Sequence, residues 1–218
     1  MARNKSKNNK FLSYNNKERT NKNFKCKNFE QSDSYNTKFT RSNFSYVNFR
    51  KSKMKYCGFN GAIFEGTEFK KSNFKGSRFK GAKFKNALFY HTNLSKTNFE
   101  DAEFENTIFI ETNLKQPRGI SKNTLGIIYY SNLPNVSLSQ KIERAIKNSL
   151  NNSYILKSEV IRLKKKKKLN TINIIKLLNN FTERELIYGL RKAKDDINND
   201  FYTLSYLINF ISQNKEKI

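Results

Sequence analysis

The chain has 218 residues, and its 43 Lys and Arg residues outnumber 18 Asp and Glu residues to give a net charge of +25. This length fits one domain or a domain with an appendage, and this charge favours nucleic acid, anionic lipid or acidic protein as partners. Two cysteines and one histidine are too few for a standard zinc site, no stretch approaches the ~20 apolar residues of a membrane span, and the first residues do not form a secretory signal. We therefore expect a cytoplasmic protein without a bound metal or other cofactor.

Residues 1–19 contain six basic residues and one acidic residue, with many Lys and Asn. This composition predicts a basic, disordered arm. We expect Phe11, Leu12 and Tyr14 near its end to cover the first turn of the structure that follows.

A strict five-residue period runs from Phe24 to Leu114. Of the nineteen positions in this register, fifteen are Phe, two are Leu, one is Met54 and one is Ser34. Two positions before each of them, from Ser32 to Thr112, the residue is always Ser, Thr, Ala, Val or Cys. Neither the helical period of about 3.6 residues nor the strand period of about 2 explains this spacing, so the chain must turn a corner every five residues.

Four five-residue sides make a square of twenty residues, and stacked squares form a solenoid whose period-five side chains point inward. The order of a small residue, Asn and then Phe or Leu, as in Ser42-Asn43-Phe44 and Thr112-Asn113-Leu114, resembles the pentapeptide-repeat family. The resemblance covers about residues 20–115 and implies a right-handed, quadrilateral β-helix. Nineteen sides of five residues give 95 residues, or 4.75 coils.

The inward positions sort into four columns along the solenoid axis, and these columns are the predicted structural core. The columns are Phe24, Phe44, Phe64, Phe84 and Phe104; Phe29, Phe49, Phe69, Phe89 and Phe109; Phe39, Phe59, Phe79 and Phe99; and Ser34, Met54, Phe74, Leu94 and Leu114. Because Ser34 interrupts the fourth column, we expect a bulge or a weakly formed coil there.

Four outward residues near the end of the repeats, Leu88, Tyr90, Ile108 and Ile110, form a candidate contact patch. Apolar patches of this kind mark contact surfaces. The first candidate to cover it is the C-terminal segment of the same chain, and a second copy in a homodimer is the alternative.

After the repeats, residues 116–136 carry both prolines and two glycines and predict a connecting segment. Residues 137–218 show helical spacing and predict an α-helical bundle, with helices near residues 138–150, 155–163 and 172–178 and a last helix opening at Asp200. The sequence Thr182-Glu183-Arg184-Glu185 is a capping box and predicts a helix start. The expected fold class is thus mainly β, a β-helix followed by an α-helical region.

The densest charge run lies within this helical region. Its members are the candidate anion contacts Arg162, Lys164, Lys165, Lys166, Lys167 and Lys168. Consecutive lysines near a helix end fit phosphate groups, and a solvated helix end in a Lys-rich chain is the alternative interpretation.

No constellation of residues supports catalysis, so we expect no enzyme. His91 falls at an outward corner, the repeat glycines fall at corners rather than in a phosphate-binding loop, and the carboxylates from Glu100 to Glu111 lie on the surface without a facing wall.

We interpret the chain as a non-enzymatic binding or scaffold protein, with a rigid β-helix surface and a basic helical tail that engages an anionic partner. Direct nucleic-acid binding through the tail is the first alternative. The second follows from the family resemblance, because family members protect type II topoisomerases from quinolones by imitating duplex DNA. Residues 20–115 hold 18 basic and 9 acidic residues, which is the wrong sign for such a mimic.

Overall fold

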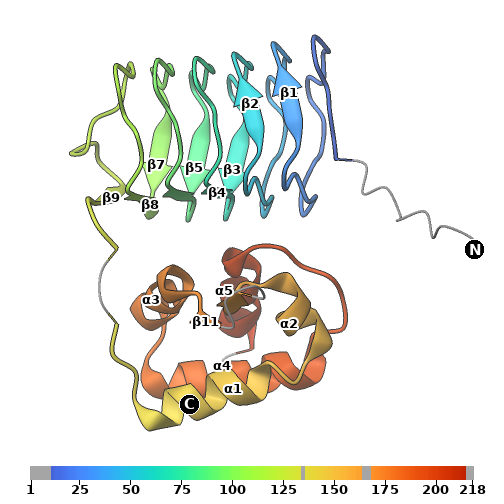
Figure 1. Cartoon of the computed structure of the whole chain (residues 1–218), viewed down its shortest axis with the longest axis vertical. Helices are drawn as coiled ribbons and strands as arrows, with labels where there is room; N and C mark the ends of the chain where they lie inside the picture. Colours follow the sequence, from blue (N-terminus) through green and yellow to red (C-terminus); the bar gives the residue numbers. More distant parts are fainter. Residues whose placement is uncertain (1–10, 134–135, 164–167, 215–218) are drawn as a thin grey trace, which may run out of the picture.

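The computed structural model describes residues 11–133, 136–163 and 168–214. The first of these parts winds into a solenoid, and the rest forms a group of helices beside it (Figure 1). No helix in these ranges is long and apolar enough to cross a bilayer.

The solenoid is built from short parallel strands. They are β1 (Asp33–Tyr35), β2 (Lys53–Lys55), β3 (Ile63–Glu65), β4 (Glu68–Lys70), β5 (Lys83–Lys85), β6 (Leu88–Tyr90), β7 (Glu103–Glu105), β8 (Thr107–Ile110) and β9 (Ile127–Tyr130). Partners lie twenty residues apart, as in Phe64, Phe84 and Phe104. One ladder runs from Ser13 to Asn113 in five steps of twenty residues, which makes five turns. The predicted four-sided β-helix is confirmed.

Each corner of the solenoid holds one residue in left-handed backbone. From Asn16 to Gln116, every fifth residue has a positive φ, in seventeen non-glycine residues and four glycines. A hydrogen bond closes the turn, as where Lys27 N–H donates to Phe24 O at 3.0 Å. Left-handed backbone costs an ordinary residue roughly 1–2 kcal/mol, so the ladders and the core must offset considerable strain.

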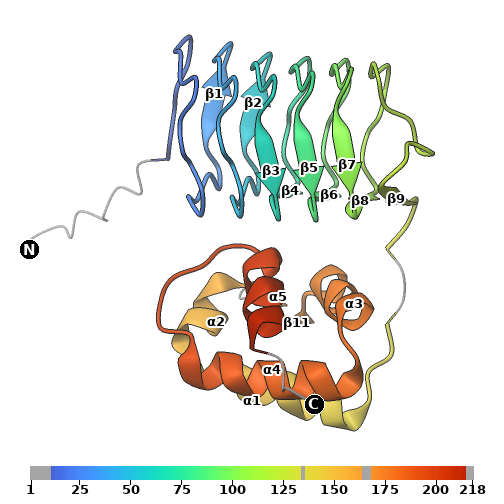
Figure 2. The ribbon, with the colours of Figure 1, turned by 180° about the vertical axis from the view of Figure 1, so that it is seen from behind.

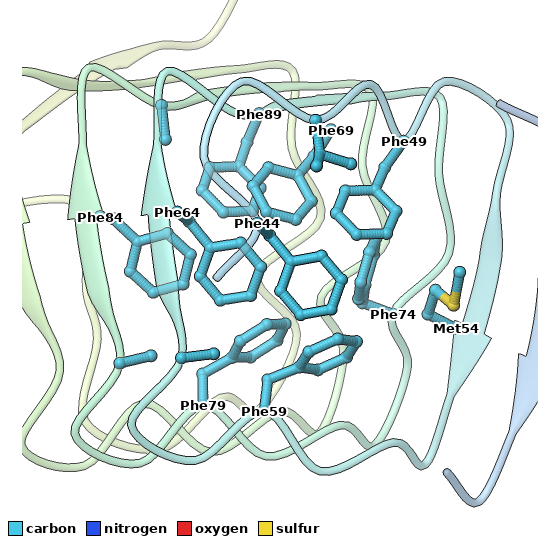
Figure 3. Close-up of a cluster of buried hydrophobic side chains, with 14 of the residues drawn as sticks. Phe44, Phe49, Met54, Phe59, Phe64, Phe69, Phe74, Phe79, Phe84 and Phe89 are labelled. Atoms are coloured by element: carbon cyan, nitrogen blue, oxygen red, sulfur yellow. The ribbon is translucent and has the colours of Figure 1, made fainter. Parts of the chain in front are cut away.

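Aromatic rings stacked at successive levels form the core (Figure 3). The Phe44, Phe64 and Phe84 ring centroids are 5.4 and 4.9 Å apart, with interplanar angles of 10° and 7°. Rings of adjacent columns meet edge to face, as Phe69 and Phe74 do at 5.2 Å. Of the inward residues, only Phe24, Phe104 and Leu114 at the two ends remain partly exposed.

The bulge expected at Ser34 does not form. Ser34 is buried and pairs in register with Met54. Its Oγ accepts a hydrogen bond from Tyr14 N–H at 3.2 Å. The Tyr14 ring, which precedes Ser34 in the same column, packs against the Phe24, Phe29 and Phe39 rings and supplies the bulk that Ser34 lacks.

The solenoid extends beyond both predicted ends. The Ser13–Asp33 bridge lies before residue 20, and Leu12 and Tyr14 pack against the core, so residues 11–19 are not a disordered arm. At the other end, β9 lies within the predicted connecting segment and pairs with β8. A Cβ on Gly126 would lie 1.9 Å from Phe104 O, so only glycine allows this last turn.

The helical region contains α1 (Gln140–Ser149), α2 (Ser153–Ser158), α3 (Thr171–Asn180), α4 (Glu183–Asp196) and α5 (Leu204–Gln213), with a short hairpin of β10 (Arg162–Leu163) and β11 (Lys168–Leu169). The capping box between Thr182 and Glu185 is present. A Cβ on Gly189 of α4 would lie 2.3 Å from Ile211 of α5, so glycine permits the close approach of these two helices.

Two predicted helix limits are wrong. The second helix ends at Ser158, because Glu159 adopts left-handed backbone with φ 56° and leads the chain into the hairpin. The last helix begins at Leu204 rather than Asp200. Asp200 instead binds Lys157, with an N–O distance of 2.9 Å.

We predict that Phe69→Ala lowers the free energy of unfolding by ~3–5 kcal/mol, because it removes a buried ring between Phe49 and Phe89 and leaves a cavity. Urea unfolding monitored by circular dichroism measures this change. Leu125→Ala is the control, since Leu125 is 93% exposed and its truncation should change stability by no more than about 0.5 kcal/mol. Equal stability of the two variants would show that the ring columns do not hold the solenoid.

Candidate functional site

The helical region docks on the solenoid side that contains β4, β6, β8 and β9 (Figures 1 and 2). Ile172 of α3 forms a buried cluster with Leu88, Ile108 and Ile110, and Tyr90 packs against its edge. The residues of the candidate contact patch are therefore covered by the C-terminal segment of the same chain. They are not available for a homodimer contact in this arrangement.

A carboxylate of the solenoid caps a helix of the helical region. Glu68 is 4% exposed, and its Oε1 accepts a hydrogen bond from Leu204 N–H at 2.6 Å. Leu204 opens α5, and the side chain of Thr203, the N-cap residue, makes no capping hydrogen bond. An acceptor with negative charge satisfies a free N–H at a helix start and interacts favourably with the helix dipole.

Two lysines surround this carboxylate. Lys70 Nζ lies 2.6 Å from Glu68 Oε2 and donates to Asn173 Oδ1 at 3.0 Å. Lys176 of α3 is almost fully buried, and its Nζ donates to Asn86 O at 3.1 Å. Burial lowers the pKa of Lys176 to about 8, although the nearby Glu68 favours the charged form. This cluster ties α3 and α5 to the solenoid.

A second charged link lies at the edge of the interface. Arg50 of the solenoid binds Glu30 at 2.6 Å and Glu159 of the helical region at 3.0 Å. Because Arg50 holds one carboxylate from each part, it adds a directional contact to the apolar one around Ile172.

Of the six candidate anion contacts, only Arg162 and Lys168 lie within the described residues. Arg162 lies half-buried in β10, and the residues Lys164–Lys167 fall outside the described ranges. Lys168 in β11 pairs with Leu163 across the hairpin. Within the described ranges, no group of His, Cys, Asp and Glu has the arrangement of a metal site.

A basic groove between α1 and α4 was missed by the sequence analysis. Its volume is about 660 Å³. Lys141 and Arg144 come from α1, Arg191 and Lys194 come from α4, and Ile187 contributes apolar surface. Lys194 is paired with Asp195 at 3.4 Å, whereas the other three cations form no ion pair within the part of the chain that the structure describes. The sequence shows basic residues on both amphipathic segments, but the packing of α1 against α4 that forms the groove arises only in the folded protein.

Charges on other sides of the solenoid are paired along the twenty-residue register. Lys83 lies 3.2 Å from Glu103 and Lys85 lies 2.8 Å from Glu105. Lys80 lies 3.5 Å from Asp101. Asp101, Glu103 and Glu105 therefore lie against lysines, which interrupts any continuous acidic surface.

Parallel strands twenty residues apart, left-handed corners and stacked rings define a β-solenoid built from five-residue repeats. The family model described as a pentapeptide repeat region matches residues 52–118. This part of the solenoid thus belongs to the pentapeptide-repeat family. No curated protein matches the chain.

Several solved structures are similar to part of the chain. The pentapeptide repeat protein Rfr23 from the cyanobacterium Cyanothece 51142 is 20% identical, with 55% of this chain and 85% of that chain covered and a TM-score of 0.38. HetL, involved in heterocyst differentiation regulation in Nostoc sp. strain PCC 7120, is 17% identical over 52% of this chain and 48% of its own, with a TM-score of 0.33. QnrB1, a plasmid-mediated fluoroquinolone resistance protein, is 14% identical over 53% and 71%, with a TM-score of 0.26.

We predict that the stability of the protein relative to its Lys176→Met variant rises by ~2–3 kcal/mol between pH 7 and pH 10. The ordinary Lys pKa is 10.5 and the folded value is about 8, so in this window the unfolded chain keeps the proton and the folded protein releases it. Folding is then favoured as the pH increases. Urea unfolding of both proteins at the two pH values measures the difference, which cancels the titration of all other groups. If the stability difference between the two proteins is the same at both pH values, burial does not lower the pKa of Lys176.

Proposed function

We propose that the protein is a non-enzymatic scaffold whose α1–α4 groove docks an acidic segment of a partner protein. The observation that carries this proposal is the groove itself, where Lys141, Arg144, Arg191 and Lys194 surround apolar surface from Ile187. The solenoid supports the groove, because the helices are fixed to it by the Ile172 cluster and by Glu68.

The mixture of charge and apolar surface favours a protein segment over nucleic acid. Ile187 and Tyr188 line an adjoining hollow together with Lys141, Arg184 and Arg191. An amphipathic segment offers carboxylates to the cations and apolar side chains to Ile187, whereas a phosphate backbone would leave this apolar surface unused. Electrostatic complementarity would mainly set the specificity and the association rate.

The absence of an enzymatic role is part of the same proposal. The bulky residues of the repeats are used for the core, and their outward charges are mostly paired or solvated. The thiol of Cys57 is buried, which raises its pKa to about 11 and makes it a poor nucleophile. We place the protein in a reducing compartment such as the cytoplasm, because both Cys26 and Cys57 are free thiols.

Two alternative functions would use other surfaces of the protein. Nucleic-acid binding through the helical region would use Arg162 and the lysine run that follows it. Topoisomerase interaction by DNA imitation would need an acidic surface, and the pairing of Glu103 and Glu105 with Lys83 and Lys85 weighs against it.

We predict that Arg144→Glu/Arg191→Glu weakens binding of a short amphipathic peptide, with Glu on one face and Leu on the other, by about tenfold or more, because reversal turns two attractions into repulsions. Fluorescence anisotropy of the labelled peptide measures the dissociation constant. Lys17→Glu/Lys22→Glu is the control, since it makes the same charge change on exposed residues of the first turn. Equal affinities of the two double variants would refute docking in the groove, and so would stronger binding of an oligonucleotide there.

A further inference from the structure

Two tyrosines of the solenoid lie outside the aromatic core. Tyr35 of β1 is 47% exposed, and Tyr56, at the corner that follows β2 in the next turn, is 44% exposed. Their ring centroids are 5.5 Å apart, with an interplanar angle of 67°. A Cβ on Gly76 would lie 2.5 Å from the Tyr56 ring, so this ring rests over a glycine corner. The sequence analysis sorted only the inward positions into columns and overlooked this pair.

Lysines continue from this pair along the solenoid axis. Tyr35 is the ladder partner of Lys55, Tyr56 N–H donates to Lys75 O at 3.0 Å, and Lys96 N–H donates to Lys115 O at 3.0 Å. We call these six residues the tyrosine–lysine row: Tyr35, Lys55, Tyr56, Lys75, Lys96 and Lys115. Because backbone hydrogen bonds join the successive levels, their spacing is fixed by the ladder.

The four lysines of the row differ in their pairing from three other lysines of the solenoid. None of the four forms an ion pair within the described ranges, whereas Lys80, Lys83 and Lys85 each lie within ion-pair distance of a carboxylate. Lys96 and Lys115 are exposed, and Lys55 and Lys75 are half-buried. The row therefore carries positive charge that the molecule itself does not neutralise.

The spacing of the row fits a strand of nucleic acid. Lys55 and Lys115 are three turns apart, which at ~4.8 Å per level is about 14 Å. A strand with stacked bases carries one phosphate per ~3.4 Å, so this length faces about four phosphates. Four unpaired lysines thus match the charge of the strand segment that the row can contact.

We propose that the tyrosine–lysine row binds single-stranded nucleic acid. The lysines contact successive phosphates, and Tyr35 and Tyr56 stack on bases at one end of the row. Exposed aromatic rings beside a cationic track are the combination by which proteins bind single strands, because every base offers a face for stacking. In a duplex the bases are already stacked on each other, so the tyrosines favour a single strand.

This site goes beyond the proposed docking groove and is separate from it. The helices cover the side of the solenoid that contains β4, β6, β8 and β9, whereas the row begins on β1 and β2 (Figure 1). Among the described residues, the inter-part hydrogen bonds and the apolar cluster that join the helical region to the solenoid come from other residues. A protein segment and a nucleic-acid strand could therefore be held by the same molecule.

Binding of a fluorescein-labelled single-stranded oligothymidine to the full chain, measured by anisotropy across a range of salt concentrations, tests the row. Lys75→Gln/Lys96→Gln/Lys115→Gln should reduce the slope of log affinity against log salt by about 2, at ~0.7 for each lost phosphate contact. Tyr35→Ala/Tyr56→Ala should weaken binding about tenfold or more, and Tyr35→Phe/Tyr56→Phe should retain it, because the phenyl ring still stacks.

Lys80→Gln/Lys83→Gln/Lys85→Gln is the matched control, because it removes the same charge from lysines that are paired with carboxylates. Oligothymidine binding should survive in this control and in Arg144→Glu/Arg191→Glu, which separates the row from the groove. Melting curves verify that each variant is folded. The proposal is overturned if the control weakens binding as much as the row variant, if a duplex binds as tightly as the single strand, or if only anionic phosphatidylserine vesicles bind.

Discussion

The structure depends on one repeated contact, a phenyl ring lying against the ring twenty residues away. Ring centroids within a column are 4.3 to 5.4 Å apart, close to the ~4.8 Å between neighbouring strands. The same spacing therefore suits both the backbone hydrogen bonds and the stacked rings, so neither interaction is distorted by the other. This agreement offsets the left-handed backbone at every corner, which no single side would tolerate in isolation.

The same register decides what the outer surface offers. Outward residues twenty apart lie beside each other whatever their charges. Where the charges are opposite, as for Lys85 and Glu105, they form an ion pair. Where lysine lies beside lysine, the positive charge is not neutralised. Leu88 and Ile108, which lie in one column, contact Ile172 of α3. Glu68, in the preceding turn of the same column, caps the start of α5. A periodic interior thus provides rigid, non-periodic surfaces, which is what a scaffold requires.

The sequence predicted the solenoid because its signal is a period repeated nineteen times, and it failed where the signal is not periodic. Tyr14 and Tyr129 keep the twenty-residue register with Ser34 and Phe109, but Arg19, Gly119 and Thr124 interrupt the five-residue pattern between them and the repeats. Ser34 was misjudged because the bulk beside it comes from Tyr14 in the preceding turn. The groove depends on α1 meeting α4, which no local pattern encodes. The tyrosine–lysine row could have been found by counting outward residues in steps of twenty, but the sequence analysis applied this count only to the inward columns.

Glu68 helps to fix the position of the helical region on the solenoid. It therefore also fixes where the α1–α4 groove lies relative to the tyrosine–lysine row. A buried carboxylate between two lysines is weak evidence for stability, because an apolar group of the same shape often serves as well. The carboxylate of Glu68 instead selects the position of α5, because its hydrogen bond from Leu204 N–H forms only when α5 begins at that point of the solenoid surface. Arg50 and Lys176 impose similar conditions at the edge and on α3. Apolar contact around Ile172 would allow the helices to slide, whereas these polar contacts select one position. The groove between α1 and α4 is thereby held at a fixed place relative to the solenoid.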